Sequence, residues 1–461
     1  MKYYDRIYGE LTFPPIIQEL LDCPGLLRLR DVRMANNQFA AFPAFANTSR
    51  YEHSLGVCYL AGICADSLGL PEKEKIELMI ACLYHDVGTP PFAHAMEEVL
   101  QIHFNFDHEE NLRQIVNGTS GSFEGNLEQI FFGATTKLRS VCHSKLGRKI
   151  GLDLYSLYRI ADIIVGEKDE VLSPLLNGNG MDLDNIDNVI RASSAMGIIG
   201  SEDMRLPIQL AESFMFDEDN KICHNGLYLN EIKRWQQIRD DQYTAIFESV
   251  DDFAYQTMIK KALSLMLKED IQQRMSKDSW KLTDSSILYD FLLKNERCKE
   301  IMTRVQLCKP YCCLGVLYVQ GSGSSRFINA NLTNIESVAS KYFMEVLGLK
   351  ETDEKVNELS TGVVVANFYP DKRKRAIYTE AICLGTKMSI DEPNSNRPDG
   401  ALLGLFTPLY NSNRITVEDE NGKSIRKMVS FRQEHLSELI KILKTHVFND
   451  FDISVYERGR K

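Results

Sequence analysis

Residues 50–56 read Arg-Tyr-Glu-His-Ser-Leu-Gly, and residues 84–88 read Tyr-His-Asp-Val-Gly. Both strings lie in patterns where apolar residues recur at three-to-four spacing, which is typical of helices. Neighbouring residues on a helix point about 100° apart, so His85 and Asp86 can reach one metal ion only where their helix ends beside a cavity. Pro90-Pro91 follows at once and ends the helix there. The second string therefore indicates a candidate site at a helix end.

A second imidazole, His53, stands on the preceding helical pattern. An isolated His-Asp pair is more often a surface contact than a metal site, but the upstream His and a further one at His94 favour a metal centre. Two imidazoles and a carboxylate suit Fe, Mn, Zn or Mg and leave open positions for water. A later helix is expected to supply one more carboxylate. Asp162, inside an apolar helical pattern, and Asp184, near a helix start, are the two candidates.

Composition places the chain among globular proteins. It has 461 residues, of which 44% are hydrophobic and 25% charged. No apolar run approaches the roughly 18 residues of a membrane span, and no signal peptide follows Met1, so a cytoplasmic protein is expected. The formal charge of −11 argues against nucleic acid as a partner. Eleven cysteines without framework spacing are expected to be buried free thiols.

The spacing of apolar residues changes after Pro310, from mainly helical to mixed strand and helix. Helical spacing upstream covers residues 14–21, 51–68, 71–85, 95–102, 152–165, 184–196 and 230–275. Strand-like runs downstream cover 311–319, 361–369 and 375–384, with helical patterns at 335–347 and 433–447. The pattern predicts a mainly α fold, with a helical domain over residues 1–310 and a smaller α+β domain over residues 311–461. Residues 321–325 and 372–375 are expected in hairpin connections.

These strings resemble the HD-domain deoxynucleoside triphosphate triphosphohydrolases, a family that includes bacterial dGTP triphosphohydrolases and the vertebrate sterile-alpha-motif-and-HD dNTPase. Further matching strings are Asp5-Arg6-Ile7-Tyr8-Gly9, Leu20-Leu21-Asp22-Cys23-Pro24 and Leu29-Arg30. The likeness covers roughly residues 1–265 and is architectural after Pro310. Because the Asp5 string stands at the start, no sterile-alpha-motif domain is expected before it. The resemblance implies an HD-type helical core, with the C-terminal domain serving assembly or regulation.

The resemblance also implies which residues bind the metal. In the family, the ligands are two His, the Asp of the His-Asp pair, and the second Asp of an Asp-x-Asp string at a helix start. Asp182-Leu183-Asp184 matches that string. The expected metal ligands are therefore His53, His85, Asp86 and Asp184. Asp182 is then expected to cap the helix.

Arg50 matches a family arginine that contacts the triphosphate. Arg239 matches an arginine that grips the γ-phosphate, Tyr243 lies one helical turn later, and Asn188 stands where the family approaches phosphate and ribose. An exposed helix face is the alternative interpretation for Arg239 and Tyr243.

His94, His108 and Glu109 match groups that surround the scissile phosphoester in the family. An imidazole at such a position can orient the attacking water or protonate the departing sugar oxygen. These three residues are the expected catalytic groups.

Several positions depart from the family. Thr89 replaces a His that touches phosphate, Met34 replaces a Gln that reads the sugar, and Asn185 and Asn188 replace a Lys and a Tyr. All four expected metal ligands are present, whereas several residues that contact the sugar and the phosphates in the family are replaced. The reaction type is thus better specified than the substrate.

The expected activity is metal-dependent hydrolysis of deoxynucleoside triphosphates to deoxynucleoside and inorganic triphosphate, with Mg²⁺ bound to the substrate phosphates. One alternative is an HD phosphohydrolase of another nucleotide: a monophosphate, an alarmone or a cyclic oligonucleotide. The other is a weakly catalytic nucleotide sensor. The substitutions near the phosphates favour these alternatives, and the complete ligand set opposes the sensor.

The resemblance finally implies a homo-oligomer, a tetramer or hexamer, that is activated by a nucleotide. Asp22 and Arg30 match residues that hold the activating nucleotide in the vertebrate branch, but Leu27 replaces a Gln of that site. Alternatively, Asp22 ends a helix before Pro24 and Arg30 makes a structural ion pair.

Overall fold

The computed structural model describes residues 2–35, 41–118, 137–168, 170–178, 181–269, 275–352, 356, 359, 361–371, 379–383, 386–390, 400–409, 415–418, 424–427 and 431–456. Its helices are α1 (Pro15–Gln18), α2 (Pro24–Arg28), α3 (Pro43–Ala46), α4 (Arg50–Ser67), α5 (Glu72–Tyr84), α6 (His94–Phe104), α7 (His108–Val116), α9 (Leu138–Cys142), α10 (Lys145–Ile150), α11 (Leu154–Val165), α12 (Leu183–Met196), α13 (Leu206–Glu212), α14 (Leu229–Glu248), α15 (Val250–Glu269), α17 (Asp284–Ser286), α18 (Glu296–Gln306), α19 (Ser324–Leu347) and α21 (Gln433–His446). Its strands are β1 (Tyr3–Asp5), β2 (Gly9–Leu11), β3 (Phe214–Phe216), β4 (Ile222–Asn225), β5 (Cys312–Gln320), β6 (Val365–Pro370), β7 (Thr379–Cys383), β8 (Thr386–Ile390), β9 (Gly400–Thr407), β10 (Ile415–Glu418), β11 (Ser424–Lys427) and β12 (Asp452–Val455).

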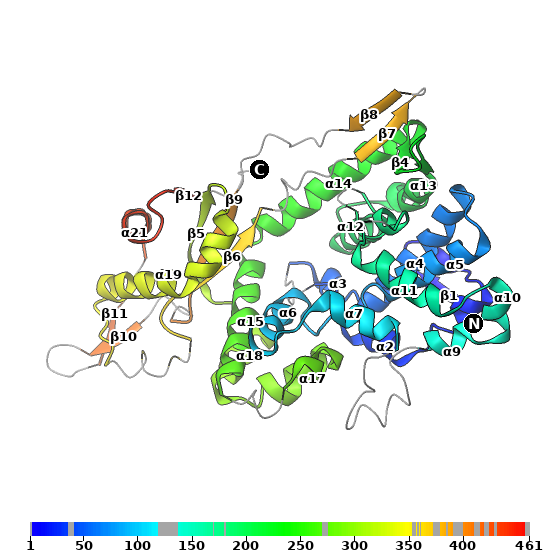
Figure 1. The fold of residues 1–461 in the computed structure, drawn as a ribbon. Helices are drawn as coiled ribbons and strands as arrows, with labels where there is room; N and C mark the ends of the chain where they lie inside the picture. Colours follow the sequence, from blue (N-terminus) through cyan, green and yellow to red (C-terminus); the bar gives the residue numbers. More distant parts are fainter. Residues whose placement is uncertain are drawn as a thin grey trace.

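The helical part is built around the pair α4 and α5. Helices α12 and α13 pack against α4, and α11 packs against α5. Figure 1 shows these helices together on one side of the molecule, with α14 and α15 leading from them to the C-terminal elements. No helix in the described ranges is long and apolar enough to cross a bilayer. The mainly α fold expected from the sequence is confirmed.

The helical pattern over residues 230–275 was expected as one helix, and the structure divides it into α14 and α15. Ser249 leaves helical geometry, with φ −83° and ψ 90°, and separates the two. Its hydroxyl donates to Asp252 at 2.5 Å, and its carbonyl accepts from the Phe253 amide, so the serine starts a new helix.

The expected hairpin connection at residues 321–325 is also wrong. Gly323 takes a left-handed φ of +79°, and α19 begins at the next residue, Ser324, so the segment joins a strand to a helix. The other expected hairpin tip, at residues 372–375, lies outside the described residues.

A four-stranded antiparallel sheet forms the centre of the C-terminal part, in the order β12-β5-β9-β6. Successive side chains alternate between its faces. Leu317 and Leu403 point into a core shared with α19 and α21, whereas Val316 and Phe406 join the large core of the helical part. The Phe406 ring packs on Phe253 of α15, with centroids 5.4 Å apart. The sheet is therefore covered by helices on both faces.

A second sheet joins distant segments, because β7 pairs in parallel with β4 and places Ala381 opposite His224. The residues after 310 thus take part in both a sheet and a core of the upstream segment. A division into domains at residue 310 remains a prediction.

We expect a chain truncated after Pro310 to be much less stable than the full chain. Truncation would uncover side chains such as Phe253, and each large apolar side chain contributes roughly 1.5–3 kcal/mol when fully buried. Thermal unfolding of both chains tests this expectation. A truncated chain that unfolds cooperatively at the temperature of the full chain would show an independent helical domain instead.

Candidate metal centre

The structure brings His53, His85 and Asp86 together from two helices. His53 lies near the start of α4, and the other two residues directly follow α5. One ligand atom of each residue lies within 4.8 Å of the others. The carboxylate of Asp184, in the first turn of α12, contacts both imidazoles. His53, His85 and Asp86 therefore form a group that could hold a metal ion, and the fourth expected ligand, Asp184, adjoins its two imidazoles.

The two imidazole Nε2 atoms face each other at 3.3 Å. Asp184 Oδ1 lies 2.8 Å from Nε2 of His53 and 3.7 Å from Nε2 of His85. Asp86 Oδ2 lies 3.6 Å from Nε2 of His85. Two ring nitrogens and two carboxylates thus converge on one small region.

The outward ring nitrogens fix which atoms carry hydrogen. His53 Nδ1 lies 2.7 Å from a carboxylate oxygen of Asp187, and His85 Nδ1 lies 2.7 Å from the carbonyl oxygen of Cys82. Carboxylates and carbonyls only accept, so each Nδ1 must donate. In the neutral tautomers, both Nε2 lone pairs then point into the cluster beside carboxylates. Such a donor set fits a divalent cation.

The charges of the cluster perturb its pKa values strongly. Burial alone would lower the pKa of His53, but the carboxylates of Asp184 and Asp187 outweigh it and raise this pKa to about 9. Burial alone would raise the pKa of Asp86, but the positive charges of Arg50, His85 and His53 hold it well below its ordinary value. A metal ion would have to displace the proton that His53 otherwise holds at neutral pH.

Asp187 holds His53 in this orientation, and the sequence analysis did not single it out. It is completely buried on α12 and accepts from Tyr8 Oη at 2.6 Å and from Arg191 Nε and Nη2 at 2.8 and 2.9 Å. Arg191 in turn donates to Asp5 at 2.8 Å. These contacts form a carboxylate–histidine support of the kind that orients metal-binding imidazoles.

The string Asp5-Arg6-Ile7-Tyr8-Gly9 forms the turn between β1 and β2. The Asp5 carboxylate accepts from the amides of Ile7 and Tyr8 at 2.7 and 3.2 Å, and Gly9 takes the left-handed φ of +71° that closes the turn. The turn thereby presents Asp5 to Arg191 and the Tyr8 hydroxyl to Asp187. The family resemblance included this string but implied no role for it. In the structure, the string contacts Asp187 and Arg191, the residues that support His53.

Gly56 leaves room for the same support. A Cβ at this position would stand 2.2 Å from Asp187 Oδ1 and 2.5 Å from Arg191 Nη2, far inside van der Waals contact. A glycine in the middle of α4 therefore lets α12 bring its buried ion pair against the helix.

We expect Gly56→Ala to lower the free energy of unfolding by roughly 1–3 kcal/mol, because overpacking displaces the buried pair. Gly62→Ala on the same helix is the matched control, since its Cβ would meet only the flexible end of Met79 at 3.3 Å. Alanine also improves helix propensity by about 1 kcal/mol at either position. Urea unfolding measures both changes, and equal effects of the two variants would contradict the steric argument.

The loop after Asp86 is held by two buried side chains. Arg28 donates to the carbonyls of Val87 and Thr89 at 3.0 and 2.7 Å and also to carbonyls of residues 280 and 282. Asp284 accepts from the Phe92 amide at 2.8 Å. The segment that ends the His-Asp helix is thus fixed from two sides.

Arg50, the first residue of α4, contacts the cluster directly. Its Nη1 donates to both oxygens of Asp86 at 2.6 and 2.7 Å. Thr89, which stands where the resemblance implied a His, donates its hydroxyl to the same carboxylate at 2.9 Å. Both side chains therefore position Asp86 in this structure.

The three expected catalytic residues differ in their surroundings. His108 starts α7 beside Glu97, Asp86 and Arg50, and burial lowers its pKa. His94 is largely exposed, with Nδ1 3.1 Å from Glu97, and Glu109 is exposed. Of the three, His108 has the clearest electrostatic contact with the cluster.

Arg239, Tyr243 and Asn188 lie on α14 and α12, which pack together. The buried Arg239 guanidinium stands over the Tyr243 ring, 4.8 Å from its centroid, and Asn188 is half-buried. Their role toward a substrate remains a prediction.

Asp22 and Arg30, the expected effector residues, have different partners. Lys137 donates to Asp22 at 2.6 Å, and the Arg30 guanidinium lies over the Tyr51 ring at 4.8 Å.

The two other aspartates weighed in the choice of the fourth ligand have partners of their own. Asp162, the rejected ligand candidate, accepts from Arg113 at 2.5 Å. Asp182 caps α12 as expected, by accepting from the Asn185 amide.

Three of the four expected ligands lie in a segment that resembles known proteins. A family model described as the HD domain matches residues 50–167. Human deoxynucleoside triphosphate triphosphohydrolase SAMHD1 is 35% identical over 100 residues, which are 20% of this chain and 16% of the human protein. The SAMHD1 homolog of Dictyostelium discoideum is 38% identical over 100 residues, 20% of this chain and 19% of that protein.

The chain therefore carries an HD domain, and its expected resemblance to dNTP triphosphohydrolases is confirmed over the HD region. The matched segment spans less than a fifth of either relative and is shorter than the range expected from the sequence. A crystal structure of a hypothetical protein from Aquifex aeolicus has a TM-score of 0.62 at 19% identity, over 88% of this chain and 96% of that chain. This likeness shows a shared fold.

Proposed function

We propose that the protein is a metal-dependent phosphohydrolase that converts deoxynucleoside triphosphates to deoxynucleoside and inorganic triphosphate. The observation that carries this proposal is that two imidazole Nε2 atoms and the Asp86 carboxylate meet within the segment matched by the HD-domain model, with the Asp184 carboxylate of α12 beside the imidazoles. The activity for which the SAMHD1 relatives are named supports the choice of substrate.

In this proposal, His53, His85, Asp86 and Asp184 hold one divalent ion, Fe, Mn, Zn or Mg. A bound divalent ion supplies a water of lowered pKa and neutralises phosphate charge, helped by Mg²⁺ on the triphosphate. Asp187 keeps the His53 ring turned toward the ion by accepting from Nδ1.

We assign the proton transfer to His108. Burial lowers its pKa, which favours the neutral imidazole that could take a proton from the attacking water or, once protonated, pass one to the departing sugar oxygen. His94 and Glu109 are proposed to act at the same phosphoester. Arg50, Arg239, Tyr243 and Asn188 are proposed to bind the nucleotide.

A second candidate is an HD phosphohydrolase of another nucleotide. The Thr89 hydroxyl donates to Asp86 rather than to a phosphate, so a phosphate contact implied by the resemblance is missing. A nucleoside monophosphate, an alarmone or a cyclic oligonucleotide would need fewer triphosphate contacts.

We further propose a cytoplasmic homo-oligomer with a nucleotide effector bound through Asp22 and Arg30. Ten of the eleven cysteines have described side chains, and these ten are free thiols, seven of them buried, which supports a reducing compartment.

Product analysis tests the reaction. Each dNTP is incubated with the protein and Mn²⁺ or Mg²⁺, and the products are separated by ion-exchange chromatography. We expect deoxynucleoside and inorganic triphosphate in equal amounts, because attack at the α-phosphorus releases all three phosphates as one intact triphosphate. Orthophosphate as the sole inorganic product would show attack at the γ-phosphorus and contradict the proposal.

Two isosteric variants test the fourth ligand. Asp184→Asn is expected to lose most of the bound transition metal, because the change removes a charged ligand. Its rate of hydrolysis should fall by at least about 100-fold. Asp162→Asn is the control, since Asp162 pairs with Arg113 instead. Elemental analysis decides between them, and full metal in Asp184→Asn with none in Asp162→Asn would reverse the ligand choice.

A further inference from the structure

The backbone just before α6 adopts a conformation that is unusual for the residues that occupy it. Phe92 has φ +55°, and Ala93 has φ +46° with ψ −126°. Glycine adopts such φ values readily, whereas the Cβ of any other residue meets the backbone there. Two consecutive non-glycine residues in this conformation need support from the rest of the fold. The strained pair lies between the proposed metal ligand Asp86 and His94, the first residue of α6.

The residues around this point do little to start a helix by themselves. Ala93 is the N-cap of α6, and an alanine has no side-chain oxygen to accept from the first amides of the helix. Its carbonyl accepts from the amides of Met96 and Glu97 at 3.1 and 3.0 Å. The side chains of Phe92 and Ala93 are both buried. The start of α6 must therefore be fixed by contacts from elsewhere in the chain.

Asp284, the first residue of α17, supplies such a contact. Its Oδ1 accepts from the Phe92 amide at 2.8 Å, and its Oδ2 accepts from the Arg33 amide at 3.1 Å. Arg33 forms an isolated β-bridge with Ser49, the N-cap of α4. One carboxylate thus links the segments that lead into α4 and α6.

The Asp284 carboxylate is held in the interior, with only 6% of the residue exposed. Burial raises its pKa to about 6, although both amide donors lower it. Because this pKa stays below 7, the group is ionised at neutral pH and both of its oxygens can accept. Asp284 also lies outside residues 50–167, the segment that the HD-domain model matches. The support for the loop therefore comes from beyond the matched segment.

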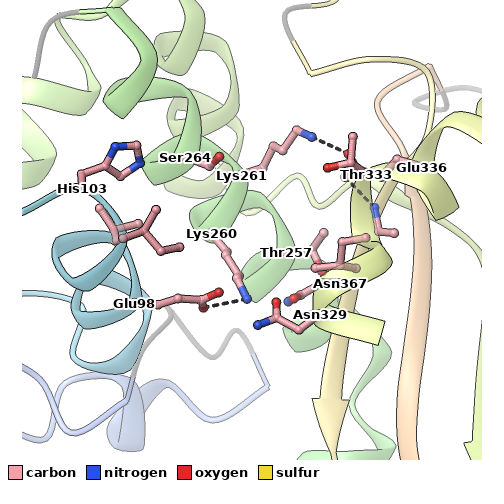
Figure 2. A pocket seen from close by; sticks show the side chains of 14 residues that line it. Glu98, His103, Thr257, Lys260, Lys261, Ser264, Asn329, Thr333, Glu336 and Asn367 are labelled. Carbon is pink, nitrogen blue, oxygen red and sulfur yellow. Dashed lines mark hydrogen bonds and ion pairs between the residues drawn. The ribbon is translucent and has the colours of Figure 1, made fainter. Parts of the chain in front are cut away.

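The rest of α6 is held independently of Asp284. Glu98 pairs with Lys260 of α15 at 2.9 Å, and Figure 2 shows these two side chains meeting between the helices. Leu100, further along α6, is fully buried in the large core. Loss of the Asp284 contact should therefore displace the first turn of α6, which carries His94, and leave the remainder of the helix in place.

We propose that Asp284 is a positioning residue for the reaction. By accepting from the Phe92 amide, it keeps residues 92 and 93 in their left-handed conformation and thereby sets the place of His94. Arg28 holds the metal side of the loop separately, so Asp284 acts on the start of α6 and not on metal binding. The inference rests on the proposed function, in which His94 acts at the phosphoester.

Two substitutions test the proposal together. Asp284→Ala removes the acceptor, so kcat for dNTP hydrolysis should fall at least about tenfold, while KM and bound metal change by less than about twofold. Adding Ala93→Gly to this variant should restore kcat to within about threefold of the wild type, because glycine adopts the left-handed conformation without support. Rates are compared at a temperature where circular dichroism shows the variants to be folded.

Asp203→Ala is the matched control. Asp203 is as buried as Asp284, at 6% exposure, but pairs with Arg234 of α14 instead of holding a backbone amide of the loop. This substitution should lower the unfolding temperature and leave kcat unchanged. Equal losses of kcat in Asp203→Ala and Asp284→Ala would show a general effect of removing a buried carboxylate and would overturn the proposal.

A crystal structure of Asp284→Ala reads the loop without any assay of activity. We expect residues 92 and 93 to return to negative φ and His94 to move with them. Positive φ retained at both residues, an unchanged kcat, a loss of bound metal, or a failure of Ala93→Gly to rescue Asp284→Ala, whether the double variant is slow or unfolded, would each overturn the proposal. If the wild type hydrolyses no dNTP, the proposed function fails, and the crystal structure still decides whether Asp284 holds the loop.

Discussion

The ion pair between Asp187 and Arg191 is fully buried, and the arrangement of the candidate metal centre depends on it. Breaking such a pair by removing one partner costs about 3–5 kcal/mol, because the remaining charge stays uncompensated in the interior. Asp187 has its lone pairs occupied by Arg191, by the Tyr8 hydroxyl and by Nδ1 of His53. The last contact decides the His53 tautomer, and therefore which ring nitrogen faces His85.

The Asp187–Arg191 pair also determines how the N-terminal hairpin and α4 pack against α12. Arg191 needs Asp5, so the N-terminal hairpin must dock on α12, and α12 can approach α4 only because residue 56 is a glycine. The same approach brings Asp184, one helical turn before Asp187, to the two imidazoles. A support for one histidine thus also positions the fourth proposed ligand.

The sequence predicted the local parts of this arrangement well. Apolar residues at three-to-four spacing predicted α4, α5 and α12, and the cap at Asp182 followed from the match of Asp182-Leu183-Asp184 to the family string that begins a helix. Asp187 and Arg191 escaped notice because an Asp-Arg pair at i and i+4 usually lies on an exposed helix face. A glycine inside a helix signals a close approach, but α4 contains two, and the sequence does not distinguish Gly56, which faces the buried pair, from Gly62, which faces Met79.

Non-local features could not be read in this way. The parallel pairing of β7 with β4 joins segments more than 150 residues apart, and the side chains of β5 divide between two cores that only the packed sheet defines. The convergence of the four proposed ligands is likewise non-local and could not be predicted from the sequence pattern alone.

Anomalous diffraction from a crystal grown with Mn²⁺ tests the convergence of these ligands on one metal ion. We expect one strong peak between the Nε2 atoms of His53 and His85 and the carboxylates of Asp86 and Asp184. A cluster without a peak, or a strong peak at Asp162 instead, would contradict it.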